Sequence, residues 1–193
     1  ILDDIGFDYI EGGWPGANPV DTEFFNKSLN LKKSIFTGFG MTKKTGRSAD
    51  NDPSLSALIN ANCNAVCVVG KAWDFHVKIA LGIKNEDNWE NIRDTAKHIV
   101  KNKKEFLFDA EHFFDGYKAN PNYALDCLKQ AYDSGARWLV LCDTNGGTLP
   151  NEIGDIINKV TKVIPGKNLG IHAHNDTENA VANSLIAILA GAR

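Results

Sequence analysis

The chain has 193 residues, of which 43% are hydrophobic and 23% charged, a composition typical of one soluble globular domain. Its 24 acidic and 21 basic residues give a formal net charge of −3, so we expect neither a nucleic-acid partner nor a membrane-surface partner. No apolar run reaches the roughly 18 residues of a membrane helix, and the cysteine spacings match no zinc ribbon, which favours reduced thiols in a cytoplasmic protein.

Six short runs rich in β-branched and aromatic residues recur along the chain, and the segments between them carry apolar residues at helical spacing. Strands that alternate with helices about every 30 residues predict parallel pairing with right-handed crossovers. The expected strands are Phe7–Ile10, Ser34–Phe39, Ala65–Val69, Glu105–Phe108, Trp138–Cys142 and Leu169–His172.

Capping residues followed by proline predict where several helices begin, because proline suits the first helical turn. The helix after Pro121 carries its apolar side chains on one face, and we expect it to end at Gly135, a residue suited to the left-handed C-terminal position. The capped pairs are Asn18-Pro19, Asp52-Pro53 and Asn120-Pro121, and Leu149-Pro150 opens a further helix.

An α/β barrel and a doubly wound sheet both fit this alternation. The Gly12–Gly16 segment lacks the Gly-x-Gly-x-x-Gly spacing of a dinucleotide fold, which favours the barrel. The chain opens with what reads as the last turn of a helix, Ile1–Ile5, ending at Gly6. We therefore expect residues 1–193 to form a partial catalytic domain, a (β/α)8 TIM barrel whose first and last strands lie outside the chain.

Polar residues gather at the C-terminal ends of the expected strands, which form the reactive face of such barrels. Residues two apart in an extended segment project to the same side, so His172 and His174 can present two imidazoles to one metal ion. The alternative is a pair of merely hydrogen-bonded rings, but Asn175 and Asp176 beside them favour a metal site. The other polar candidates are Glu11, Asp74, His76, Glu111, His112, Asp143 and Thr144.

Each of the other candidates has a structural alternative. Glu111, which follows an apolar strand, suits a proton carrier or hydrogen-bond acceptor, or else it pairs with Lys118 at the surface. The Thr144 hydroxyl can bind a carboxylate, or the residues around it only shape a turn. His76 can belong simply to the first turn of a helix, and Glu11 precedes a glycine-rich loop that suits a ligand or a tight turn.

Four segments together resemble the isopropylmalate, homocitrate and citramalate synthase family, which shares a metal-dependent TIM barrel with HMG-CoA lyase. The likeness is strongest to the citramalate synthase branch and spans the whole chain. It implies an acyltransferase of leucine or isoleucine biosynthesis that condenses acetyl-CoA with an α-keto acid such as pyruvate, assisted by Mn, Mg or Zn. The segments are Ile10–Gly16, Phe108–Tyr117, Leu141–Gly147 and Gly170–Asp176.

The resemblance also implies residue roles and a homodimer in the full-length protein. The family's third metal ligand is an aspartate in an Asp-x-x-Leu-Arg-Asp-Gly motif, and this chain begins after that motif, so we expect the 193 residues alone to be inactive. A carbon-carbon lyase or aldolase, and an inactive metal-binding fragment, remain alternatives. The implied roles are metal ligation by His172 and His174, keto-acid binding by Thr144, a catalytic position for Glu111, and pocket positions for Glu11 and His76.

Overall fold

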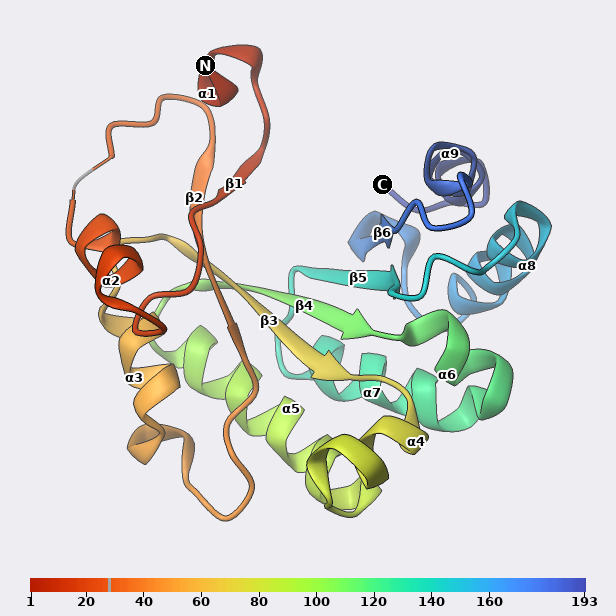
Figure 1. Cartoon of the computed structure of the whole chain (residues 1–193), viewed down its shortest axis with the longest axis horizontal. Coiled ribbons are helices and arrows are strands. Elements are labelled where there is room, and N and C mark those ends of the chain that lie inside the picture. Colours follow the sequence, from red (N-terminus) through yellow and green to blue (C-terminus); the bar gives the residue numbers. More distant parts are fainter. Residues whose placement is uncertain (28) are drawn as a thin grey trace.

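The computed structural model describes residues 1–27 and 29–193. Its strands form one six-stranded parallel sheet, ordered as in the chain (Figure 1). This confirms the expected α/β class and parallel pairing. The strands are β1 (Tyr9–Glu11), β2 (Ile35–Met41), β3 (Ala65–Lys71), β4 (Glu105–Glu111), β5 (Trp138–Asp143) and β6 (Leu169–Ala173).

All six expected strands are present, although several bounds differ from those predicted. The structure carries β3 to Lys71 and β4 to Glu111, because these two residues are paired in the parallel ladder beyond the apolar run. The first strand begins only at Tyr9, where its pairing with Ile35 starts. Extension of β3 and β4 places two charged side chains inside the reactive edge of the sheet.

The sheet curls like part of a barrel. Tyr9 on β1 donates a hydrogen bond to Glu105 on β4, and the indole nitrogen of Trp138 on β5 donates to the Tyr9 hydroxyl at 3.1 Å. Strands three or four places apart in a flat sheet could not make these contacts, because neighbouring strands lie about 4.8 Å apart. The curl remains open between β1 and β6 (Figure 1), so the fold is six strands of a TIM barrel.

Local sequence signals account for the helix ends. Asn18, Asp52 and Asn120 each accept a backbone N–H of the first turn through their side chains, as predicted. The chain leaves α7 at Gly135 with φ +102°, in the left-handed region that favours glycine. The helices are α1 (Leu2–Ile5), α2 (Pro19–Phe25), α3 (Pro53–Asn60), α4 (Asp74–His76), α5 (Asn85–Lys101), α6 (Phe113–Ala119), α7 (Pro121–Asp133), α8 (Pro150–Val160) and α9 (Ala180–Leu189), with short turns at Ala49–Asn51, Val77–Leu81 and Gly166–Asn168.

The main core lies between the convex face of the sheet and the helices that cover it (Figure 1). Phe106, Phe108 and Leu139 are buried there against helix residues such as Ile92 and Leu128. Each such side chain contributes about 1.5–3 kcal/mol relative to an exposed position. Within the described residues, no helix combines the length and apolarity that crossing a bilayer requires. The polar concave face is therefore held in place by an apolar outer layer.

Candidate functional site

The candidate site lies on the concave face, near the C-terminal ends of four consecutive strands. At these ends the concave face carries Asp109 and Glu111 of β4, Cys142 of β5 and His172 of β6, as the two-residue period of a strand requires. Cys142 on β5 is the direct neighbour of His172 on β6, and Lys71 on β3 is the neighbour of Glu111 on β4. Groups separated by up to a hundred residues in sequence thus meet on one face.

His172 and His174 lie side by side, with ring centroids 4.8 Å apart and ring planes at 63°. His172 is exposed and His174 half-buried. Asn175 does not face this pair with its oxygen, because that oxygen accepts the Ala180 amide at 3.2 Å at the start of α9. The two imidazoles are placed as expected for one shared ion, and metal ligation itself stays a prediction.

A second group of metal-binding donors includes His172. Its imidazole, the Asp109 carboxylate and the Cys142 thiol each offer an atom within 4.8 Å of the others. Burial raises the pKa of Asp109 and of the Cys142 thiol. The neighbouring Cys67 side chain offsets part of this rise in the pKa of Asp109. The concave face therefore holds carboxylate, thiol and imidazole donors within reach of one another.

Glu111 forms an ion pair with Lys71. The predicted alternative, a surface pair with Lys118, is wrong, because Lys118 lies instead beside Glu152, with 3.8 Å between nitrogen and oxygen. Sequence proximity suggested Lys118, whereas the strand register brings Lys71 to the same height on the neighbouring strand. The Glu111 side chain is 25% exposed, which leaves the carboxylate accessible from the open edge.

The Thr144 hydroxyl accepts the backbone N–H of His112 at 2.8 Å. Its own proton remains available to an acceptor such as a carboxylate. The alternative prediction, a residue that only shapes a turn, applies to Asp143. Its buried carboxylate accepts hydrogen bonds from the hydroxyl and the backbone N–H of Thr148, at 2.8 Å and 3.3 Å. Asp143 therefore shapes the turn, while Thr144 presents its hydroxyl at the strand end.

His76 lies in the short helix α4, as the structural alternative predicted. Its ring also reaches the edge of the site. The His76 ring lies 4.2 Å from the His112 ring and 4.8 Å from the Trp73 ring, measured between centroids. Loss of solvent is the main cause that lowers the pKa of His76, and the positive charges of His112 and Lys71 lower it further. His112 also approaches Asp115, with 3.4 Å between Nδ1 and Oδ2.

Glu11 reaches the concave face from β1 and keeps access to solvent. Partial burial raises the pKa of Glu11, and the negative charge of Asp109 raises it further. The glycine loop after it has a structural role, because a Cβ on Gly12 would come within 2.5 Å of the Phe36 ring. Gly12 thus leaves room for the Phe36 ring, and its N–H continues the ladder by donating to the Thr37 carbonyl at 3.0 Å. The Glu11 carboxylate lies close enough to Asp109 for the two charges to interact.

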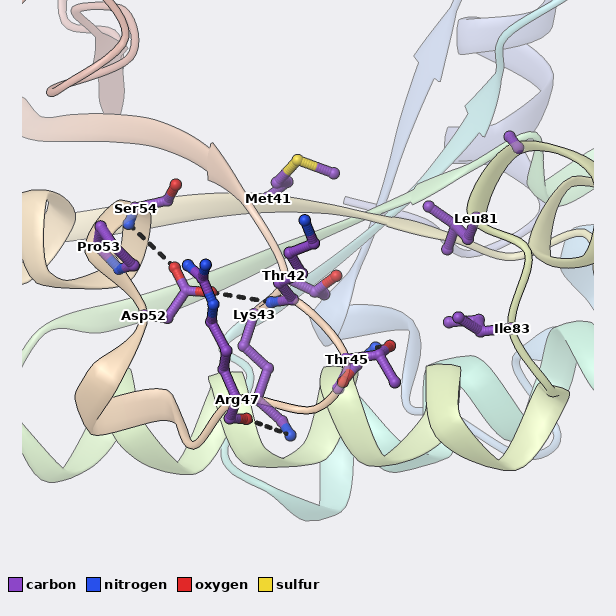
Figure 2. Close-up of a pocket in the computed structure, with 13 residues that line it drawn as sticks. Met41, Thr42, Lys43, Thr45, Arg47, Asp52, Pro53, Ser54, Leu81 and Ile83 are labelled. Carbon is purple, nitrogen blue, oxygen red and sulfur yellow. Dashed lines mark hydrogen bonds between the residues drawn. The ribbon is translucent and has the colours of Figure 1, made fainter.

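A cavity of about 770 Å³ opens beside the C-terminal end of β2 (Figure 2). Lys44 and Arg47 provide exposed positive charge at its wall, and Leu81 and Ile83 provide apolar surface. The loop is held by Asp52, whose carboxylate accepts the backbone N–H of Lys44 at 2.9 Å. The sequence did not predict this cavity, because its walls come from four separate segments.

Asp109, Cys142 and Lys71 were also missed as site residues. Asp109 stands two positions before Glu111, so the strand period could have placed both on one face. Cys142 was interpreted as a small hydrophobe because it ends an apolar run. Lys71 lay beyond the predicted strand end, so its inward direction was not anticipated.

The fold and the site together define an α/β barrel domain that collects its reactive groups at the C-terminal edge of parallel strands. The chain belongs to the HMGL-like family, which matches residues 1–193. An (R)-citramalate synthase from Aquifex aeolicus (strain VF5) is 52% identical over 194 residues, covering 100% of this chain and 37% of the relative. A second, from Geobacter sulfurreducens, is 50% identical, covering 98% of this chain and 36% of the relative.

Solved structures give the same fold. Hydroxymethylglutaryl-CoA lyase from Pseudomonas aeruginosa superposes with a TM-score of 0.80 at 17% identity, covering 99% of this chain and 63% of that chain. The lyase from Brucella melitensis gives a TM-score of 0.77 at 16% identity, covering 100% and 68%. At these identities the likeness concerns the fold alone. The chain spans a little over a third of the length of the citramalate synthases it matches.

Proposed function

We propose that this chain forms most of the catalytic barrel of an acyltransferase that condenses acetyl-CoA with an α-keto acid, pyruvate or a close relative, to give citramalate or a related 2-hydroxy diacid. The observation that carries the proposal is the meeting of Glu111, Thr144 and the His172–His174 pair at one edge of the sheet. The synthases that share about half of its residues support the same chemistry.

The donor set suits a divalent cation such as Mn²⁺, Mg²⁺ or Zn²⁺, because two imidazoles lie side by side with the Asp109 carboxylate close to one of them. His172 and His174 would hold this ion. When bound, it would polarise the ketone of the keto acid and stabilise negative charge on its oxygen. An aspartate of the family motif, which these 193 residues do not contain, would complete the ligands.

The chain's own side chains would bind and orient the substrates. The Thr144 hydroxyl, fixed by the His112 amide, donates its proton to the keto-acid carboxylate. The Glu111 carboxylate, positioned by Lys71, lies where it can accept a proton or hydrogen bond beside the reacting carbons. By the family resemblance, Glu11 and His76 would line the same pocket.

The cavity beside β2 is proposed to take part of acetyl-CoA. Exposed Lys44 and Arg47 suit its phosphates, and the apolar wall near Leu81 suits its pantetheine arm (Figure 2). Replacing Arg47 with Glu should raise the KM for acetyl-CoA at least about tenfold, since a charge-assisted hydrogen bond is lost. The KM for the keto acid should not change, and Lys27→Glu, at an exposed lysine just after α2, serves as the charge-matched control.

The decisive experiment measures thiol release from acetyl-CoA in the presence of keto acids and Mn²⁺ or Mg²⁺, using the complete gene product. Glu111→Gln should lower kcat about 10²–10⁴-fold, as expected when a group that transfers a proton is removed. Glu23→Gln, on the exposed face of α2, should keep parent activity. A protein that releases acetyl-CoA or pyruvate from a hydroxy acid and consumes neither would instead be the lyase or aldolase alternative.

The remaining proposals concern the whole protein. We propose a cytoplasmic homodimer in which residues outside this chain complete the site, and we propose that the 193 residues alone are inactive. Acetyl-CoA turnover by the isolated chain would contradict the last point. Metal binding without any turnover by the complete gene product would favour the metal-binding alternative.

A further inference from the structure

A thiol points into the same polar layer as the metal-binding histidines. Cys142 is 5% exposed and lies directly beside His172 in the parallel ladder. Its thiol donates to the Val140 carbonyl, with 3.7 Å from sulfur to oxygen, so it has only a weak partner inside the protein. None of the roles proposed above uses this thiol, and the Asp109 carboxylate enters them only as a neighbour of the His172 imidazole.

The three donors of this layer lie at a separation that a metal ion can bridge. The ligand atoms of Asp109, Cys142 and His172 are within 4.8 Å of one another. Ligands of a tetrahedral zinc, at bond lengths of about 2.0–2.3 Å, are roughly 3.5 Å apart. Small rotations of side chains would therefore close the donors around one ion.

The composition of the donor set determines which ions it favours. A thiolate and an imidazole are soft or borderline ligands, which prefer Zn²⁺, Cd²⁺ or Co²⁺ to Mg²⁺ and Mn²⁺. The pair formed by His172 and His174 has no sulfur donor, so it favours soft ions less strongly than the thiolate-containing set does.

We propose that Asp109, Cys142 and His172 form a thiolate-containing site for a soft divalent cation such as Cd²⁺ or Zn²⁺, which shares His172 with the His172–His174 pair. On binding, the Cys142 thiol loses its proton to solvent and sulfur bonds to the ion, with no change in oxidation state. Because His172 serves both positions, a soft ion in this site competes with the ion held by His172 and His174. Zinc or cadmium in excess should then antagonise Mn²⁺.

Cobalt and cadmium probe the thiolate directly. Co²⁺ added to the purified protein should give a sulfur-to-cobalt charge-transfer band, and ¹¹³Cd NMR should give a shift typical of one sulfur donor. Cys142→Ser should abolish the band and weaken Cd²⁺ binding at least about tenfold, since even loss of an outer-sphere partner costs 10–100-fold. Cys63→Ser, a buried cysteine outside this layer, should keep the band.

A second pair of measurements separates this proposal from the proposed function. His174→Ala should weaken Mn²⁺ binding, followed by electron paramagnetic resonance, and leave the cobalt band intact. Cys142→Ser should do the reverse. In the parent protein Cd²⁺ should release bound Mn²⁺.

Any of three results would overturn the proposal: no charge-transfer band in the parent protein, a band that survives Cys142→Ser, or a band lost in His174→Ala. Should Cys142→Ser fail to fold, the ¹¹³Cd shift of the parent protein decides alone. A shift typical of oxygen and nitrogen ligands only would exclude the thiolate.

Discussion

The hydroxyl of Thr144 has two hydrogen-bonding roles. It accepts the His112 amide at 2.8 Å, and it keeps one proton to donate. Thr144→Val should raise the KM for the keto acid about 10–100-fold, because the change removes a bond to a charged group worth about 1.5–3 kcal/mol. Steady-state kinetics on the complete gene product measures this, and Thr144→Ser should restore binding. An unchanged KM in the valine variant would remove Thr144 from the substrate site.

Gly116 lies where α6 packs against the chain that leaves β3. A Cβ on this residue would come within 2.2 Å of the Ala72 carbonyl oxygen, a backbone atom that cannot rotate away. Gly116→Ala should therefore lower the free energy of unfolding by about 1–3 kcal/mol. That loss exceeds the roughly 0.5–1 kcal/mol that alanine usually gains over glycine in a helix.

Urea unfolding measures the effect of Gly116→Ala, and Gly154→Ala in α8 is the matched control. The nearest atom to a Cβ at Gly154 is a side-chain carbon of Ile186 at 3.0 Å, which can move. The control should stay within about 1 kcal/mol of the parent protein. Equal stability of the Gly116 variant and the parent would mean that α6 is not held as tightly as its contacts suggest.

At the scale of strands and helices, the sequence predicted those features that depend on neighbouring residues alone, such as the start of a capped helix. Asn18, Asp52 and Asn120 each cap the helix that the sequence assigned to them. The full length of β4 was not predictable from its apolar run, because Asp109 and Glu111 are held in the strand by pairing with β3. Strand ends that carry function are polar, so hydrophobicity alone underestimates them.

Part of the candidate site was predictable from the local period of a strand. His172 and His174 follow the two-residue period of a strand, so their proximity followed from the sequence. The pairing of Glu111 with Lys71 did not, because the two residues are 40 positions apart and only the register brings them together. Nor did any local pattern predict that His112 takes φ +56° and directs its amide at Thr144.

Tyr9 connects β1 to β4 and β5 across the concave face, and its ionisation should control how β1 is held. Desolvation and the bond to Glu105 raise the pKa of Tyr9 to about 12. In the unfolded chain a tyrosine ionises near pKa 10. Between these values the folded state keeps a proton that the unfolded state releases, so the free energy of unfolding falls as pH rises from about 10 to 12.

Tyr9→Phe should make that fall less steep, measured by urea unfolding at several pH values. It should also lower stability at pH 7 by about 1–2 kcal/mol, since the bonds to Glu105 and Trp138 are lost. Some slope should remain, because burial also raises the pKa of Tyr123. Tyr132→Phe on α7 is the control. An identical slope in Tyr9→Phe and the parent would show that Tyr9 ionises alike in both states.

At the scale of the whole molecule, the curled sheet has apolar surface beside its open side. On α9, Val181 is 74% exposed and Leu189 is 82% exposed, and within the described residues β6 pairs with β5 alone. Unpaired strand edges beside exposed apolar side chains promote association between chains. We therefore expect the 193-residue chain to self-associate at micromolar concentration. Sedimentation velocity over a concentration series measures the association constant.

The double change Val181→Lys and Leu189→Lys should shift the chain toward monomer, because each lysine must be desolvated when the surface is covered. Val20→Lys on α2 is matched in exposure, at 76%, but lies away from α9, and it should associate like the parent. A monomeric parent chain would mean that the open side of the curl tolerates water despite its apolar surface. Equal weakening by Val20→Lys would show that the effect does not depend on the α9 surface. Net charge does not explain such a result, since each added lysine brings the formal charge of −3 closer to zero and so reduces the repulsion between chains.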